Sequence, residues 1–187
     1  MDVVSRFRRP DAPALILVSN REPFIHERDA SGQITVSHPA GGLTAALQPM
    51  LAATGGTWIA WGSGAADFDV TDAMDGVRVP PQTPAYRLRR LRLTPEEVRG
   101  YYIETANRAL WPLCHSQISL LIYEAEHWKT YRRVNERFAA AAVTEAGGRE
   151  AVVWLQDYHL ACVPAMLRDA RRLFVHQFWH IPWPQAD

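Results

Sequence analysis

Four short apolar runs, each ending in polar residues, alternate with helix-forming stretches along this chain, and this alternation limits its fold the most. The apolar runs cover residues 14–18, 57–61, 151–155 and 173–179. The helix-forming stretches cover residues 43–53, 94–111 and 128–146. Such an alternation predicts a parallel sheet, because parallel strands are joined by helical crossovers that cover the sheet. We therefore expect an α/β fold, a Rossmann-like sheet with helices on both faces.

Length and charge narrow the class of protein. A chain of 187 residues suggests one domain, and 48% hydrophobic residues can form a sizeable core. We expect residues 1–13 to be a flexible tail and residues 14–187 to be the folded unit. Lys and Arg total 20, as do Asp and Glu, which argues against general binding of nucleic acid or of an acidic membrane. The chain has no apolar run of membrane-spanning length and no apolar secretory signal in its first ten residues, which favours a cytoplasmic protein.

Local signals predict where several elements begin and end. Thr94, Pro95 and Glu97 are typical of a helix start, with a capping residue, a proline in the first turn and a glutamate that closes a capping box. This helix is expected to end at Pro112. A further short helix is expected over residues 160–171. Two cysteines, at positions 114 and 162, lack the spacing of a metal site and are predicted to be buried free thiols.

Three polar stretches are expected to lie at the surface. Residues 86–93 alternate apolar and arginine side chains, which predicts an exposed edge strand with a solvated arginine face. Residues 67–84, rich in Pro and Asp, predict an irregular excursion. Residues 22–39 form a long charged loop, and residues 26–29 within it are expected to decorate a lid.

Polar side chains at the strand ends are the candidates for a binding site. Asn20 and Arg21 follow the first strand, Asp157 follows the third, and His180 follows the last. In an open parallel sheet, ligands bind beyond the carboxyl ends of the strands. The glycine pair at positions 41 and 42 precedes a helix, so backbone N–H groups there can approach an anion, and an arginine can bind a phosphate with two hydrogen bonds. The sequence therefore predicts a phosphate-handling site at this edge of the sheet.

Two further interpretations of the strand ends remain. Trp58 and Trp61 lie three residues apart on one strand and so face opposite sides, which places one in the core and one at the site. Asp157, His159 and His180 could hold a metal ion, but no ligand pair has helical spacing and no third cluster supports them, so no metal is expected.

Seven motifs in order resemble the trehalose-6-phosphate synthase family. They are residues 18–21 (VSNR), 41–43 (GGL), 58–62 (WIAWG), 101–112 with Tyr101, Tyr102, Asn107 and LWP, 131–135 (YRRVN), 154–160 (WLQDYHL) and 180–184 (HIPWP). The resemblance implies the N-terminal lobe of a two-lobed GT-B glycosyltransferase. Such enzymes transfer glucose from UDP-glucose, or another nucleotide sugar, to glucose 6-phosphate with retention and without a metal or other cofactor.

The resemblance also implies roles for single residues. Arg21 would bind the acceptor phosphate, and the acceptor sugar pocket would be lined by Trp61, Tyr102, Trp111 and Asp157. On the donor side, the turn at Gly41 and Gly42 would approach the diphosphate and His180 would face the donor sugar. No enzyme nucleophile is expected, since the leaving phosphate assists the incoming hydroxyl in this family.

Departures from the family leave more than one function open. Gln156 stands where the family has His, and Trp183 where it has Phe. The chain stops in a loop just past a strand, which suggests an N-terminal fragment that is inactive alone. The acceptor is either glucose 6-phosphate or, as in glucosylglycerol-phosphate synthases, glycerol 3-phosphate. Further hypotheses are a non-catalytic sugar-phosphate-binding or regulatory module, a homo-oligomer or partner of a full-length synthase, and a Rossmann-like oxidoreductase, which the absence of G-x-G-x-x-G disfavours.

Overall fold

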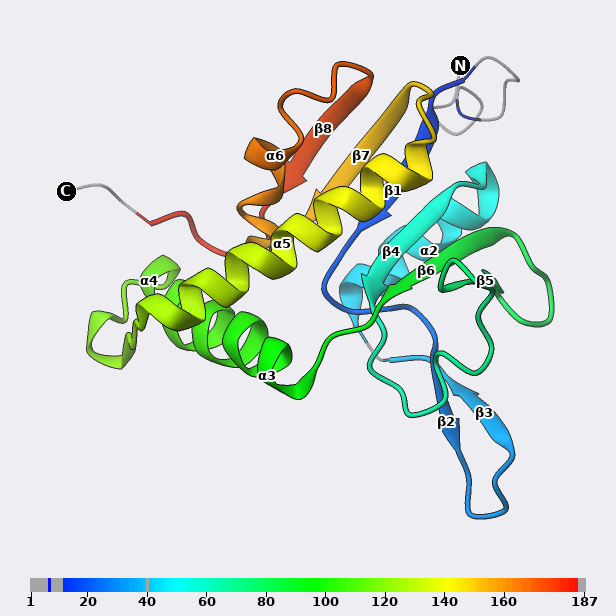
Figure 1. The fold of residues 1–187 in the computed structure, drawn as a ribbon, viewed down its shortest axis with the longest axis horizontal. Helices are drawn as coiled ribbons and strands as arrows, with labels where there is room; N and C mark the ends of the chain where they lie inside the picture. The colour runs from blue at the N-terminus through cyan, green and yellow to red at the C-terminus, as the bar shows by residue number, and fades with distance from the viewer. Residues whose placement is uncertain (1–6, 8–11, 40, 185–187) are drawn as a thin grey trace.

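A computed structural model describes residues 7, 12–39 and 41–184 and shows a six-stranded sheet with helices on both faces (Figure 1). The strands of this sheet, in spatial order, are β5 (Gly76–Val79), β6 (Tyr86–Leu91), β4 (Thr57–Trp61), β1 (Ala14–Val18), β7 (Ala151–Gln156) and β8 (Leu173–Phe178). A separate hairpin is formed by β2 (Ile25–Arg28) and β3 (Ile34–Ser37). The helices are α2 (Gly42–Thr54), α3 (Pro95–Val98), η1 (Arg99–Leu110), α4 (Trp111–Cys114), η2 (Ile118–Leu120), α5 (Ala125–Ala146), η3 (Tyr158–Leu160) and α6 (Val163–Met166).

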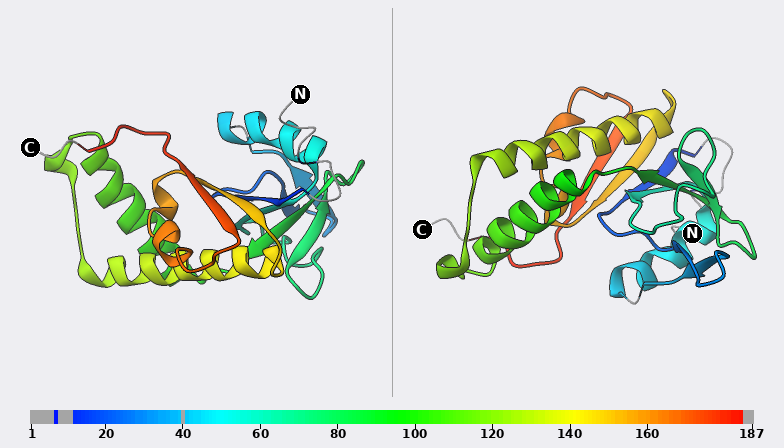
Figure 2. Two further views of the ribbon diagram at one scale, coloured as in Figure 1. Left: turned by 90° about the horizontal axis from the view of Figure 1, so that it is seen from above. Right: turned by 60° about the horizontal axis from the view of Figure 1, so that its bottom comes forward.

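The predicted Rossmann-like sheet is confirmed, with one antiparallel strand at its edge. All neighbouring pairs from β6 to β8 are parallel, and β5 pairs antiparallel with β6. Helix α5 covers one face and α2 the other, as the two views in Figure 2 show. The tail predicted for residues 1–13 lies almost wholly outside the described residues. Ala40, next to the predicted glycine pair, lies outside them too.

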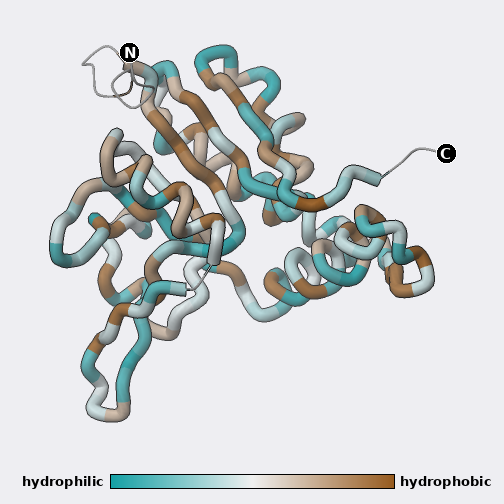
Figure 3. Tube along the Cα trace, turned by 180° about the vertical axis from the view of Figure 1, so that it is seen from behind, coloured by the Kyte–Doolittle hydropathy of each residue, from teal (hydrophilic) through white to brown (hydrophobic). Residues whose placement is uncertain are grey.

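Alternating side chains of the central strands form two cores, one on each face of the sheet. Ile16 and Val18 of β1 pack toward α5, against Val134 and Phe138, while Leu17 packs on the other face. Figure 3 shows apolar residues along the central strands and mostly polar residues along the hairpin. Helix α5 is capped by Gly147, whose left-handed φ of 57° suits a glycine, as the Gly147-Gly148 pair predicts.

The prediction of a solvated edge strand over residues 86–93 is wrong. Strand β6 lies between β4 and β5, and Tyr86, Leu88 and Arg90 on it are buried. Part of the expected irregular excursion forms β5, which takes the edge position instead. The arginines of β6 are held by carboxylates: Arg87 and Arg89 pair with Glu145 of α5.

The predicted loop over residues 22–39 is a hairpin rather than an irregular lid. His26 on β2 is buried, and its backbone N–H donates to the Asp67 Oδ1 at 2.8 Å. Glu22 and Phe24, which lead into the hairpin, are buried as well. The segment that follows β1 is therefore anchored to the body of the protein.

The predicted helix start at Thr94 is confirmed, but its end is not. Thr94 and Glu97 form the expected capping box. The helix continues through the twelve-residue π-helical segment η1 and into α4, which ends at Cys114. Pro112, the second residue of α4, stands within this continuous helix and does not end it. The helix expected over residues 160–171 is reduced to the single turn of α6.

No helix in the described part of the chain is long and apolar enough to cross a membrane.

Candidate functional site

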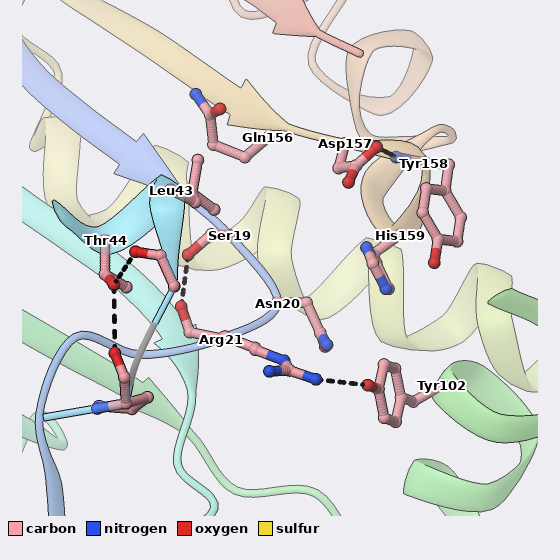
Figure 4. A pocket seen from close by; sticks show the side chains of 12 residues that line it. Ser19, Asn20, Arg21, Leu43, Thr44, Tyr102, Gln156, Asp157, Tyr158 and His159 are labelled. Carbon is pink, nitrogen blue, oxygen red and sulfur yellow. Dashed lines mark hydrogen bonds between the residues drawn. The ribbon is translucent and has the colours of Figure 1, made fainter. Parts of the chain in front are cut away.

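A cavity of about 210 Å³ opens where the carboxyl ends of β1 and β7 meet the start of α2 (Figure 4). It is lined by Ser19, Asn20, Arg21, Pro39, Gly41, Leu43, Thr44, Tyr102, Gln156, Asp157, Tyr158 and His159. A neighbouring cavity of about 220 Å³ is lined by Asn20, Arg21, Glu22, Ile25, Pro39, Trp61, Ser63 and Tyr102. We call them the helix cavity and the tryptophan cavity. They share a wall formed by Asn20, Arg21, Pro39 and Tyr102.

Arg21 is the cation of the shared wall. Its guanidinium extends across the opening and donates to the Tyr102 hydroxyl, with 3.2 Å between Nη2 and Oη. This hydrogen bond is the main cause that raises the pKa of Arg21. Burial raises the pKa of Tyr102, but the bond from Arg21 and other hydrogen bonding lower it overall. Because Arg21 is exposed, its guanidinium can bind a phosphate with two hydrogen bonds.

The start of α2 supplies a second place for negative charge. Gly41 caps the helix in extended geometry, with no capping side chain and no acidic residue in the first turn. The first N–H groups of a helix have no partner within it and carry the positive end of the helix dipole. Gly41, Leu43 and Thr44 line the helix cavity, so these amides border the same space as Arg21. Gly42 opens the helix but is outside both cavity linings.

Asp157 reaches the helix cavity from a strained backbone. Its φ of 69° and ψ of 175° are values that residues other than glycine rarely adopt. Its Oδ1 accepts from the N–H groups of Tyr158 at 3.0 Å and His180 at 3.3 Å, and its own N–H donates to the Phe178 carbonyl at 2.7 Å. These bonds leave Oδ2 to accept from a ligand hydroxyl. Strained residues of this kind cluster at binding sites.

His159 adds a neutral ring beside Asp157. Burial, with a contribution from the Arg21 charge, lowers the pKa of His159 to about 3. The ring stacks on Tyr102, with 5.6 Å between ring centroids. A neutral imidazole has one donor and one acceptor, as a sugar hydroxyl does. The wall of the cavity is thus suited to hydroxyl groups on the side opposite the cation.

A buried charge cluster holds the segment after β1 from behind. Arg90 Nε donates to Glu22 Oε2 at 2.7 Å, and Arg90 Nη2 lies 3.0 Å from Asp67 Oδ1 and 2.8 Å from the His26 Nδ1. Glu22 Oε1 accepts from the Ser63 N–H at 2.8 Å. Burial, with Asp67 close by, raises the pKa of Glu22 to about 8. The cluster thus holds the Arg90 guanidinium between two buried carboxyl groups, those of Glu22 and Asp67.

The structure brings most of the predicted site residues together, but not all. Arg21, Tyr102, Gly41 and Asp157 line the helix cavity, and Arg21, Tyr102 and Trp61 line the tryptophan cavity. Trp58, by contrast, is core, and its Nε1 donates to Ser19 Oγ at 2.8 Å.

Besides Gly42, two further predicted site residues lie outside both cavity linings. Trp111 stacks on His115, with 3.9 Å between ring centroids. His180 is exposed, and its Nε2 lies 2.9 Å from Gln156 Oε1. Trp111 is the first residue of α4, and His180 lies just past β8.

Sequence reasoning missed the charge cluster, although a signal existed. Tyr86, Leu88 and Arg90 share one face of β6 because strand side chains alternate, so the apolar pattern places Arg90 inside.

The cysteines are free, Cys114 being buried and Cys162 half-buried. Among the described residues, no group of three or more His, Cys, Asp or Glu side chains could hold a metal ion.

Comparison with known proteins identifies relatives over nearly the whole chain. The family model for glycosyltransferase family 20 matches residues 13–187. The trehalose-6-phosphate synthase of Mycobacterium avium is 40% identical over 173 residues, which make up 92% of this chain and 34% of that protein.

Solved structures agree. The crystal structure of an alpha,alpha-trehalose-phosphate synthase (UDP-forming) from Burkholderia vietnamiensis is similar with a TM-score of 0.71 and 29% identity, over 94% of this chain and 35% of that one. The synthase from Burkholderia xenovorans in complex with glucose-6-phosphate has a TM-score of 0.66 and 28% identity, over 91% of this chain and 34% of that one. This chain thus spans about a third of the length of the relatives it matches.

Proposed function

This chain belongs to glycosyltransferase family 20, and from that premise we propose that residues 14–187 form the acceptor-binding lobe of a trehalose-6-phosphate synthase. The enzyme would transfer glucose from UDP-glucose to glucose 6-phosphate with retention, as part of trehalose synthesis in the cytoplasm. The observation that carries the proposal is the shared wall of two cavities at the carboxyl edge of the sheet, where the Arg21 guanidinium faces open space. The relative from B. xenovorans, which is described in complex with glucose-6-phosphate, supports the choice of acceptor.

We assign the acceptor to the region around Arg21. The guanidinium binds the phosphate, and Tyr102 positions the guanidinium through its hydroxyl. Trp61 supplies an aromatic face to the C–H side of the sugar ring, and Trp111, at the start of α4, would supply a second one. Asp157 accepts hydrogen bonds from sugar hydroxyls through Oδ2. The cation, carboxylate and aromatic rings together match a sugar phosphate.

We assign the donor diphosphate to the start of α2. A leaving nucleoside diphosphate gains negative charge in the transition state, and the backbone N–H groups at the start of α2 would stabilise it, Gly41 from the cavity lining and Gly42 from beside it. His180 faces the donor sugar from the end of β8. The description of the B. vietnamiensis relative as UDP-forming supports a uridine nucleotide as donor.

Isothermal titration of this chain with glucose 6-phosphate tests the proposal. A charge-assisted hydrogen bond contributes about 1.5–3 kcal/mol, so Arg21→Ala should weaken binding by about 10- to 100-fold. Arg171→Ala removes an exposed arginine outside both cavity linings and is the matched control, with no change expected. Equal affinity of Arg21→Ala and the unaltered chain would remove the role of Arg21.

Two further experiments distinguish this function from the competing hypotheses. Glycerol 3-phosphate binding more tightly than glucose 6-phosphate would assign the chain to an enzyme with that acceptor. Binding of glucose 6-phosphate with no glucosyl transfer is expected of these 187 residues alone, because they span about a third of the related enzymes. If the chain shows no transfer of its own but measurably changes the rate of an added full-length synthase, a regulatory module would be favoured.

A further inference from the structure

Asn20 is a buried polar side chain whose hydrogen-bonding groups have no protein partner. The residue is 4% exposed, and neither Nδ2 nor Oδ1 forms a hydrogen bond with any described residue. Leaving a buried polar group unpaired costs about 1–3 kcal/mol. A carboxamide with both ends unpaired is therefore unfavourable unless something other than these residues completes it.

The backbone on either side of this side chain is fixed, so its direction is set by the fold. The Ser19 N–H donates to the Ile59 carbonyl at 3.0 Å, and the Asn20 carbonyl accepts from the Trp61 N–H at 3.3 Å. Ser19 Oγ donates to the Arg21 carbonyl at 2.6 Å and accepts from Trp58 Nε1. These bonds hold the residues on both sides of Asn20 against β4 and the core.

The carboxamide points into the place where the two cavities meet. Asn20 lines both of them, and in Figure 4 its side chain enters the space between Arg21, Tyr102 and His159. The neighbouring groups differ in charge: Arg21 is a cation, and the His159 ring is neutral because burial lowers its pKa. A neutral carboxamide has no special affinity for phosphate, but it can donate to one hydroxyl and accept from another.

We propose that Asn20 is a substrate-contacting residue that recognises hydroxyl groups of the acceptor sugar while Arg21 binds its phosphate. The inference rests on the proposed function, since it takes the acceptor to be a sugar phosphate. It goes further by assigning the discrimination between a sugar phosphate and a bare phosphate to one side chain. A site built to hydrogen-bond a hydroxyl rejects ligands that lack it, because its own polar groups are then left unpaired.

Two variants of the same residue type test whether Asn20 serves a ligand or the fold. Asn20→Leu keeps the size of the side chain and removes the unpaired groups. Asn135→Leu is the matched control, because Asn135 is fully buried and paired: Nδ2 donates to the Tyr131 and His159 carbonyls, and Oδ1 accepts from the Cys162 N–H. We expect Asn135→Leu to lower the melting temperature by several degrees and Asn20→Leu to leave it unchanged or raise it.

Isothermal titration of the same variants with glucose 6-phosphate and with inorganic phosphate tests whether Asn20 contacts the ligand. Asn20→Leu should weaken glucose 6-phosphate binding at least about tenfold and change inorganic phosphate binding by less than about threefold, whereas Arg21→Ala should weaken both. A loss of melting temperature in Asn20→Leu as large as in Asn135→Leu, or unchanged affinity for glucose 6-phosphate, would overturn the inference. If the unaltered chain binds no glucose 6-phosphate, the proposed function itself fails. If it binds glucose 6-phosphate and Asn20→Leu binds it equally well, only the role of Asn20 fails.

Discussion

Replacing Arg90 by methionine should destabilise this protein more than the loss of any exposed charge. Arg90 lies on β6 with its side chain fully buried, and it is the one cation that contacts both Glu22 and Asp67 among the described residues. Its Nη1 and Nη2 also donate to the carbonyls of Asp67 and Phe24, both at 2.9 Å. Methionine fills a similar volume but satisfies none of these acceptors.

The loss of stability in Arg90→Met can be estimated from the buried groups that lose their partner. Removing one partner of a buried ion pair costs about 3–5 kcal/mol, because the other charge stays buried without compensation. Two carbonyl groups lose their donor as well. For a protein of this length, 1 kcal/mol corresponds to about 2–4 °C in melting temperature, so Arg90→Met should melt about 6–20 °C lower than the unaltered chain.

Urea denaturation followed by tryptophan fluorescence measures the loss, because Trp58 and Trp61 lie on the strand that neighbours β6. Arg92→Met is the matched control: its side chain pairs with Asp75 at 3.0 Å in an exposed position and should cost no more than about 1 kcal/mol. If Arg90→Met falls within about 1 kcal/mol of this control, the reasoning about the buried cluster is refuted.

Three further predictions concern Glu22, Asp157 and Thr94. Burial raises the pKa of Glu22 to about 8 from an ordinary 4.5, so the native state keeps a proton that the unfolded state has lost. The unfolding free energy should therefore fall by about 2 kcal/mol as pH rises from 6.5 to 9. Glu22→Gln should reduce this pH dependence in urea titrations at several pH values, and an unchanged pH dependence would mean that a group other than Glu22 causes it. Asp157→Gly should be at least about 1 kcal/mol more stable than Asp157→Ala, since both lack the carboxylate and only Ala keeps the strained backbone, and equal melting temperatures would mean the strain is absent. Thr94→Ala should cost about 1 kcal/mol by removing the cap of α3, which Thr94→Ser should largely restore.

The central strands can be predicted from sequence because each follows a simple physical rule. Residues 14–18 and 57–61 are apolar runs bounded by polar residues, and β1 and β4 match them to the residue. Helix α5 has an apolar stripe through Val134 and Phe138 and a glycine cap at Gly147, so its end is predictable. These local signals agree with the tertiary structure.

Elements whose burial depends on distant partners cannot be predicted in this way. The strand face that Arg90 shares with Tyr86 and Leu88 indicates its burial, but nothing local indicates its partners Glu22 and Asp67, which are far away in sequence. The charged residues of the β2–β3 hairpin suggest a loop for the same reason. Strand β5 has only four residues and lies in the stretch rich in Pro and Asp, so no local signal marks it as a strand.

The candidate site can be predicted in part. The strand-end rule finds Arg21 and Asp157, because parallel strands bring their carboxyl ends to one edge. Tyr102 comes only from the resemblance, since it stands on η1, and no sequence rule places that segment opposite β1. Asn20 is recognisable as a strand-end residue, but its unpaired carboxamide is a property of the folded state alone.

The central claim is that a sugar phosphate binds at the shared wall of the two cavities. Backbone amide NMR of this chain, recorded with and without saturating glucose 6-phosphate, tests it most directly. We predict that shifts concentrate at residues 19–22, 41–44, 102 and 157–159, and that Arg21→Ala abolishes them at the same ligand concentration. Shifts confined to the opposite edge of the sheet, or no shifts at all, would contradict the account.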